Sequence, residues 1–375
     1  MRICHVASGD VWGGAERVIS LLVEGIQKLG EHHVEGILFN EGQLSKIMKA
    51  SAIDVQVLSE SEHSFWQLCQ KFRRILMVSA GTEGQYDILH VHRYKELLLV
   101  LLASFPRLPR IIYTIHGFEP WPKIRLKEAL RIWGCVILAR LCGVLIVVVS
   151  TELERRLARV VGRSCVRRIG NPMPTIVPIN VAVDCRHRYG WPSSKKIVGF
   201  VGRLEYVKGP DLFLELAGRI HDDNIGFVVL GWGTMGEKLV KQGESRLLES
   251  RVRFLGHVQD PLSYMREMDV LVMTSRHEGF PMAVVEAATL GIPVVAFDVG
   301  GIRDVMTESL GTRIVPFGDM ELLTKEVVSV LGENEAREAT QEWGRTLRAQ
   351  FGLPKVIEQY VNLYRTISEE LSPTR

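Results

Sequence analysis

The 375-residue sequence has almost no excess of either charge, since its 46 Lys and Arg residues are balanced by 43 Asp and Glu residues. The resulting net charge of +3 gives no support to a nucleic-acid partner. Hydrophobic residues make up 46% of the chain, which is typical of a folded globular protein and excludes a disordered one. A chain of this length exceeds one ordinary hydrophobic core and suits two domains.

The sequence also lacks ordered cysteine spacing, a signal peptide and a convincing membrane span. Its six cysteines are scattered without disulfide or metal-site spacing, so we expect a reduced, cytoplasmic chain. The first residues start a strand and leave no room for a signal peptide. Segment 132–149 is apolar, but Arg140 interrupts it and Gly143 separates a helix-like half from a β-branched half. This segment therefore predicts a helix followed by a buried strand.

Short β-branched runs alternate with helical patterns along the chain. Such alternation predicts α/β domains on parallel sheets, with functional loops at the carboxyl ends of the strands. The proline-rich segment 169–194 predicts the linker between the two domains. The predicted strands are 3–7, 34–39, 55–58, 88–92, 111–115, 144–149, 196–201, 227–230, 252–258, 269–273 and 294–297.

The stretch 273–288 has the pattern of a strand end, a tight turn and a helix over 281–290. Pro281 suits the first helical position, and Phe280 before it offers no capping oxygen. The amides of Met282 and Ala283 are therefore expected to remain available to an anion such as a phosphate.

Two strings in the second half carry a family resemblance. The first begins at Glu278 and reads E-G-F-P-x-x-x-x-E-A-x-x-x-G-x-P-V-V-A, with Glu286 as its second acid, and the second is G-R-L-x-x-x-K-G over 202–209. Together they resemble the donor site of retaining, nucleotide-sugar-dependent glycosyltransferases of family 4, which have the GT-B fold. The resemblance implies that Glu278 contacts hydroxyls of the transferred sugar and that Glu286 holds the ribose diol.

The second string also predicts how the donor's charge is neutralised. The resemblance places Arg203 and Lys208 where a pyrophosphate needs positive counter-charges. Arginine can donate to two phosphate oxygens at once, whereas lysine provides a single point charge. No D-x-D occurs in the chain, so we expect no metal and no cofactor. The alternative is that both are ordinary surface cations.

The resemblance extends more weakly to the first half. The glycine-rich loop 8–14 lacks G-x-G-x-x-G spacing, which disfavours a dehydrogenase. Its Gly13-Gly14 pair resembles the Gly-Gly pair that the family has near the donor phosphates. The alternative is a plain tight turn. His116, followed by a glycine, matches a family histidine beside the transferred sugar, although a structural role is the alternative. The predicted catalytic residues are Glu278, His116, Arg203 and Lys208, and the predicted donor-binding residues are Gly13, Gly14, Gly202, Gly279, Phe280, Pro281, Met282, Ala283, Glu286 and Val258.

The acceptor side is less defined. His90 and His92 lie two apart on a strand and hence on one face, but the sequence shows no further metal ligand, so we favour a packed or acceptor-side pair, with His92 and Glu119 as acceptor residues. The stretch 121–133 is apolar and basic and can contact a membrane that carries a lipid-linked acceptor, or form a solvated helix face with packed tryptophans.

The sequence thus predicts an α/β protein of GT-B type with two Rossmann-like domains whose sheets face each other across a cleft. The expected domains are 1–175 for the acceptor, 176–353 for the nucleotide sugar, and a helix at 354–375 that returns to the first domain. The expected function is retaining transfer from a UDP- or GDP-sugar to a glycan or lipid-linked acceptor in polysaccharide or lipopolysaccharide biosynthesis, in the cytoplasm or at its membrane face. The alternatives are a non-hydrolysing nucleotide-sugar epimerase and a non-catalytic nucleotide-sugar-binding subunit.

Overall fold

The computed structural model describes residues 1–10, 12–82, 85–106, 108–117, 126–173, 189–245, 248, 250–258 and 260–370. It forms two compact units, one made of residues 1–172 together with the segment from Phe351 onward, and the other made of residues 173–350. Most of the segment predicted as the linker, 174–188, lies outside the described residues.

The first unit contains a seven-stranded sheet in the order β3-β2-β1-β4-β5-β6-β7, with every neighbouring pair parallel. Its central strands are buried on both faces because helices cover them, which explains their continuous apolar runs. The sequence missed only the short edge strand β7 in this sheet. The strands are β1 Arg2–Ala7, β2 His33–Leu38, β3 Asp54–Val57, β4 Ile88–Val91, β5 Ile111–Ile115, β6 Leu145–Val148 and β7 Val166–Arg168.

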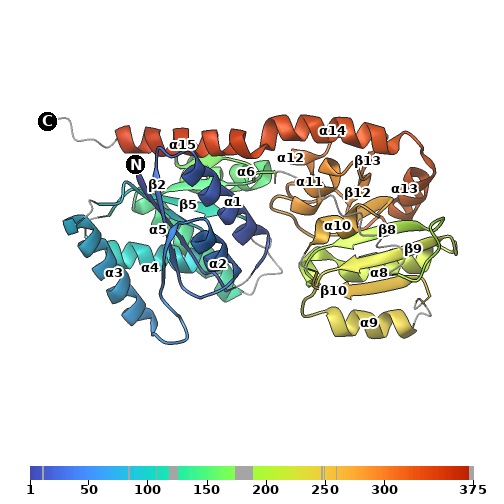
Figure 1. Ribbon diagram of the computed structural model, residues 1–375, viewed down its shortest axis with the longest axis horizontal. Helices are drawn as coiled ribbons and strands as arrows, with labels where there is room; N and C mark the ends of the chain where they lie inside the picture. The colour runs from blue at the N-terminus through green and yellow to red at the C-terminus, as the bar shows by residue number, and fades with distance from the viewer. Residues whose placement is uncertain are drawn as a thin grey trace. The chain divides into compact units, whose positions relative to one another are not determined.

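The last helix, α15, packs against α1 in this first unit (Figure 1). The approach is close, because a Cβ atom added to Gly25 of α1 would lie 2.1 Å from the Cδ1 atom of Ile357. Tyr360 and Tyr364 of α15 are fully buried, so this helix completes the core of the unit. The helices of the unit are α1 Gly14–Lys28, α2 Gln43–Ala50, α3 Phe65–Thr82, α4 Tyr94–Ser104, α5 Leu126–Leu141, α6 Thr151–Val161 and α15 Leu353–Glu370.

The second unit contains a six-stranded parallel sheet in the order β10-β9-β8-β11-β12-β13. The structure confirms the predicted α/β class and the parallel sheets, and here the sequence missed only β13. The strands are β8 Lys196–Val201, β9 Ile225–Leu230, β10 Val252–Gly256, β11 Val270–Met273, β12 Val294–Phe297 and β13 Thr312–Val315. The α-helices are α8 Pro210–Arg219, α9 Gly236–Ser245, α10 Pro261–Met265, α11 Met282–Thr289, α12 Ile302–Val305, α13 Met320–Gly332 and α14 Ala336–Phe351.

Each sheet has one place where the strand order reverses. In the first unit this switch point lies between β1 and β4, and in the second it lies between β8 and β11. The loops that follow such neighbouring strands diverge to opposite faces, which leaves the crevice in which open α/β sheets bind ligands. The residues after β1, β4, β8 and β11 are therefore the first place to look for a site.

Candidate functional site

In the second unit, the two motif loops after β8 and β11 pack directly on each other. The Thr274 hydroxyl donates to the Gly209 carbonyl oxygen over 2.8 Å, and the Arg276 amide donates to the Val207 carbonyl oxygen over 2.8 Å. Gly209 has a φ of +66°, and a Cβ atom there would lie 2.0 Å from the Thr274 carbonyl oxygen. Only glycine fits such a contact, so the G-R-L-x-x-x-K-G string ends in glycine for a packing reason.

Arg276 joins the same loops through its side chain. Its guanidinium donates to both carboxylate oxygens of Asp211, over 2.7 and 2.6 Å, and lies 3.9 Å from the centre of the Tyr206 ring. The bidentate hydrogen bond with Asp211 raises the pKa of Arg276, and the charge is therefore permanent. Sequence reasoning missed Arg276 and Asp211, because nothing in the sequence pairs residues 65 positions apart.

Glu278 is a buried carboxylate at the centre of this arrangement. Its side chain is 2% exposed, and Lys208 Nζ donates to its Oε1 and Oε2 atoms over 2.7 and 2.8 Å. The Ser275 hydroxyl donates to Oε1 over 2.6 Å. The structure thus brings together two predicted site residues that come from different motifs, and it excludes a solvated Glu278.

The backbone of Glu278 is also fixed from a third loop, which follows β12. The Gly301 amide donates to the Glu278 carbonyl oxygen over 2.9 Å. Gly300 has a φ of +55°, and a Cβ atom there would lie 1.9 Å from that same oxygen. Loops after β8, β11 and β12 therefore hold Glu278 in one orientation.

Helix α11 begins one residue later than predicted. Pro281 is the N-cap, with a φ of −80° and a ψ of 84° and no side-chain capping hydrogen bond, and Met282 is the first helical residue. Proline still suits the position, because its missing N–H is not needed at the helix start. Glu286 is 4% exposed, which excludes an ordinary surface acid at that position.

The remaining predicted donor residues lie at the ends of neighbouring strands. Arg203 is exposed, and Gly202 lies against Gly231, whose added Cβ atom would be 1.8 Å from the Gly202 carbonyl oxygen. Gly231 begins a G-x-G-x-x-G string, 231–236, which follows β9 and which sequence reasoning overlooked.

Val258 follows β10, two strands away from the switch point. Gly279, Met282 and Ala283 are half-buried, whereas Phe280 and Pro281 are buried.

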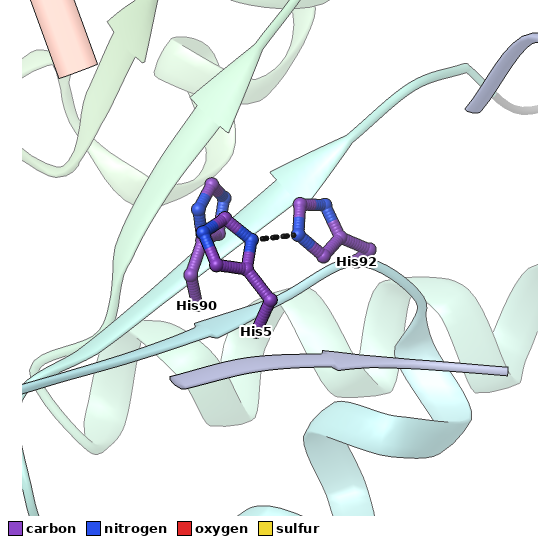
Figure 2. A group of neighbouring side chains, drawn as sticks. All are labelled: His5, His90 and His92. Carbon is purple, nitrogen blue, oxygen red and sulfur yellow. Dashed lines mark hydrogen bonds between the residues drawn. The ribbon is translucent and has the colours of Figure 1, made fainter. Parts of the chain in front are cut away.

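In the first unit, four histidines gather near the carboxyl ends of β1, β4 and β5. His5 of β1 pairs in register with His90 of β4, His92 follows β4, and His116 follows β5. We call these four residues the histidine cluster. His5 Nδ1 lies 3.0 Å from His92 Nε2, and His92 Nδ1 lies 3.3 Å from His116 Nε2. Figure 2 shows the rings of His5, His90 and His92 beside one another. His5 is the residue that sequence reasoning missed.

Burial keeps these imidazoles neutral. It lowers the pKa of His5 to about 3 and that of His116 to about 4, and it holds the pKa of His90 and His92 well below the ordinary 6.5. His116 is also near the Arg93 guanidinium, which lowers its pKa further. Neutral imidazole can both donate and accept a hydrogen bond, which suits contact with uncharged sugar hydroxyls.

The sequence predicted no third metal ligand near His90 and His92. That expectation is wrong, because His5 supplies a third imidazole, and one ring nitrogen from each of the three lies within 4.8 Å of the others. A tetrahedral zinc site has nitrogen atoms about 3.3 Å apart, from Zn–N bonds of about 2.0–2.1 Å. His90 is also engaged at both nitrogens, by Tyr364 Oη and Thr114 Oγ1, each over 2.7 Å. The observed positions therefore suit a hydrogen-bonded cluster better than a metal site.

The glycine-rich loop leads into α1, for which Gly13 is the N-cap without a side-chain hydrogen bond and Gly14 the first residue. The buried Glu16 carboxylate lies 3.3 Å from a Cβ atom added to Gly13 and forms an ion pair with Arg93. The carboxylate of Glu16 therefore lies beside the start of α1, and Arg93 is its counter-charge. Neither residue was predicted.

Glu119 and residues 121–125 of the apolar, basic stretch lie outside the described residues. Trp133 is half-buried, with the Arg156 guanidinium 5.5 Å from the centre of its ring, as the packed-tryptophan alternative predicts. Helix α5 also exposes the large apolar side chains of Leu130, Ile137 and Leu141. None of the helices in the described part of the chain combines the length and the hydropathy needed to cross a membrane.

Comparison with known proteins agrees with this architecture. Residues 12–175 match the family model described as Glycosyltransferase Family 4, and residues 184–347 match the model described as Glycosyl transferases group 1. The two parallel sheets agree with the GT-B fold, and the two family matches identify the chain as a glycosyltransferase of that class. The chain belongs to the glycosyltransferases that combine these two domains.

Relatives of this kind include the D-inositol 3-phosphate glycosyltransferase of Corynebacterium urealyticum, which is 29% identical over 49% of this chain and 46% of that protein, so the match spans less than half of its length. The UDP-Gal:alpha-D-GlcNAc-diphosphoundecaprenol alpha-1,3-galactosyltransferase of Escherichia coli is 22% identical over 92% of this chain and 94% of that protein. Among solved structures, Anabaena HepE in complex with UDP-glucose has a TM-score of 0.83 at 20% identity and covers 98% of this chain and 100% of its own, a likeness that shows the fold.

Proposed function

We propose that this protein transfers a hexose, with retention of anomeric configuration, from a nucleotide sugar to a glycan or lipid-linked acceptor in polysaccharide or lipopolysaccharide biosynthesis. The observation that carries the proposal is the buried Glu278 carboxylate, paired with Lys208 beside the start of α11 at the switch point of the second sheet. A UDP-sugar is the first donor to test, because the Escherichia coli relative is named for UDP-Gal and the Anabaena structure holds UDP-glucose.

In this proposal the second unit binds the donor. Lys208 and Arg203 neutralise the pyrophosphate, the amides at the start of α11 add partial positive charge, and Glu286 holds the ribose diol. Lys208 is paired with Glu278, so a fixed carboxylate orients the ammonium group that binds the phosphate. No divalent cation takes part.

The role of Glu278 follows from its hydrogen bonds. A nucleophile needs a carboxylate oxygen directed at the anomeric carbon, on the face opposite the leaving group. Both oxygens of Glu278 already accept from Lys208, and Oε1 also accepts from Ser275. Glu278 is therefore better suited to accept hydrogen bonds from sugar hydroxyls than to attack the anomeric carbon.

Transfer then proceeds on one face of the sugar. The bond from the anomeric carbon to the phosphate oxygen breaks, the bond to the acceptor oxygen forms, and the acceptor's proton passes to the departing phosphate. Glu278 holds the sugar in an oxocarbenium-like pose, which is transition-state binding, and His116 is the predicted sugar-binding residue of the first unit. The acceptor in this proposal is a glycan or a lipid-linked saccharide, and Glu119 and His92 are the acceptor-side residues to mutate.

The test is incubation of the purified protein with a panel of UDP- and GDP-sugars in the presence of a chelator. We expect slow hydrolysis of one donor, and transfer with retained configuration once the acceptor is supplied. Glu278→Gln should lower turnover by roughly 100-fold, about 2.7 kcal/mol, with nucleotide affinity nearly unchanged. Glu215→Gln, at an exposed ion pair on α8, is the matched control and should change neither turnover nor nucleotide affinity.

Other outcomes would replace the proposal. Conversion of the donor sugar without an acceptor would show an epimerase, and donor binding with neither transfer nor hydrolysis would show a binding subunit. Inverted product, or a glycosyl ester trapped on Glu278, would reject the same-face mechanism.

A further inference from the structure

Helix α5 of the first unit carries a row of apolar side chains on its outer side. Leu130, Ile137 and Leu141 are 64%, 49% and 78% exposed, whereas Val136 and Ala139 on the opposite side of the helix are fully buried. At 3.6 residues per turn, the three exposed residues lie within about 40° of one another around the helix axis and extend over about 16 Å. We call Leu130, Ile137 and Leu141 the α5 row.

Arginines flank the α5 row on both sides. Arg131 and Arg140 are exposed and lie roughly 80–100° around the helix from the row, one on each side. No acidic residue occurs between positions 130 and 141. An arginine at such a margin can lay its aliphatic stem along an apolar surface and keep its guanidinium at the polar boundary. An apolar centre with cationic margins is the pattern of a helix that lies in the plane of a membrane interface.

The neighbouring helix α6 presents arginines on the same side of the unit. Helices α5 and α6 connect the successive parallel strands β5, β6 and β7, so right-handed crossovers place both on one face of the sheet. The two helices are in contact, since the Arg156 guanidinium lies 5.5 Å from the centre of the Trp133 ring. Arg155 and Arg159, one turn apart, are exposed on the side of α6 opposite its buried residues. An arginine row therefore lies beside the α5 row.

The charge of this region is unbalanced. Residues 131–168 contain eight arginines, no lysine and two acids, a net charge of +6 against +3 for the whole chain. The rest of the chain is therefore net acidic. Six arginines of this region are exposed and form no ion pair with an acid in the described part of the chain, namely Arg131, Arg140, Arg155, Arg159, Arg163 and Arg167.

An anionic lipid bilayer offers what both rows require. Its acyl chains accept aliphatic side chains, and its phosphates attract guanidinium groups in the same thin interfacial layer. Single-stranded nucleic acid suits the arginines but is bound by stacking on aromatic side chains, whereas the α5 row is aliphatic.

We propose that the α5 row and the arginines beside it dock the first unit on an anionic phospholipid bilayer, with α5 lying in the plane of the interface. The inference deepens the proposed function, because a lipid-linked acceptor is held in such a bilayer. It rests on that function only for the choice of acceptor.

Co-sedimentation of the purified protein with phospholipid vesicles tests the docking without donor or acceptor. We expect binding to vesicles of phosphatidylcholine mixed with phosphatidylglycerol, much weaker binding to phosphatidylcholine alone, and release as the salt concentration rises. Ile137→Asp should weaken binding by about tenfold or more, because a charge that the bilayer repels replaces an apolar contact. The matched control is Val328→Asp on α13 of the second unit, where the valine is 48% exposed, and it should bind as the native protein does.

Two further variants separate the charge from the apolar contact. Arg159→Gln should weaken binding to the anionic vesicles by about fivefold, the contribution of one basic side chain near such a surface. Arg348→Gln, at an exposed position of α14, removes the same charge elsewhere and should have no effect. Leu141→Trp places an indole in the α5 row, and brominated acyl chains should quench its added emission only in vesicles that contain phosphatidylglycerol.

Three results would overturn the inference: no binding to anionic vesicles, native-like binding by Ile137→Asp, or equal binding to the two kinds of vesicle. A dimer that Ile137→Asp dissociates in sedimentation velocity would also overturn it, since a second copy would then cover the α5 row. Calorimetry of each variant establishes that the first unit is folded. If vesicles are bound but no donor is turned over, the proposed function fails and the docking stands, whereas transfer to a soluble acceptor without vesicle binding gives the reverse.

Discussion

Replacement of Lys208 by methionine tests whether the Lys208–Glu278 pair organises the site. The change keeps most of the side-chain volume but removes the ammonium that donates to both oxygens of a carboxylate whose side chain is only 2% exposed. Breaking a buried ion pair in this way costs about 3–5 kcal/mol. Lys208 is itself 26% exposed, so the surroundings are partly solvated and we expect the lower end, about 3 kcal/mol.

The reverse change should cost less. Glu278→Gln leaves Lys208 with access to water, so we expect about 1–2 kcal/mol, the scale of the hydrogen bonds lost. In the double variant no buried charge remains unpaired. Its cost should therefore fall short of the sum of the two single costs by about 1.5–3 kcal/mol, which is the coupling energy of the pair.

Scanning calorimetry is the assay, because it can resolve the unfolding of the second unit from that of the first. Only the transition of the second unit should move, and Glu215→Gln on α8 should leave both transitions in place. A coupling energy below about 0.5 kcal/mol would refute the reasoning, since the two residues would then be independent. An equal shift of the first unit's transition would also refute it.

The remaining predictions concern pH, metal and nucleotide. Burial lowers the pKa of His5 to about 3 and that of His116 to about 4, so below about pH 6.5 the unfolded chain binds protons that the folded first unit does not. The stability of this unit should therefore fall as the pH drops from 7 to 5, by up to about 1.4 kcal/mol per pH unit for each fully buried imidazole, and pH-independent calorimetric stability would contradict this. Donor binding, followed by titration calorimetry, should persist in chelator and weaken by about 1.5–3 kcal/mol in Arg203→Ala, whereas an absolute need for a divalent cation would reject the charge assignment. Glu286→Ala should raise the Kd for the nucleotide more than it lowers kcat, the opposite order to Glu278→Gln, and equal profiles for the two variants would contradict their separate roles.

Much of the fold could be predicted from the sequence, because buried parallel strands read as continuous β-branched runs. The two strands that were missed lie at sheet edges. β7 is Val-Arg-Arg, whose charged side chains suit an edge and hide the pattern, and β13 is short and mixed in character. The apolar segment 132–149 was correctly divided, into the end of α5 and the strand β6.

The site was only partly predictable, for a physical reason. Local motifs indicated Glu278 and Lys208 separately, but their contact depends on β8 and β11 being neighbours, which sheet order decides and local sequence does not. His5 gave no signal at all, because one histidine within an apolar strand looks like a core residue. Its importance arises only from its register opposite His90 on β4.

The first unit is discontinuous along the chain, and this has a consequence for its synthesis. Residues 173–350 make up the second unit, whereas the first unit includes α15, whose Tyr364 hydroxyl lies within hydrogen-bond distance of His90, 274 positions earlier in the chain. On the ribosome, the later-made unit can therefore finish folding first. Until α15 has been synthesised, the apolar surface of the first unit that this helix covers is exposed. A chaperone or α15 itself must cover that surface to prevent aggregation.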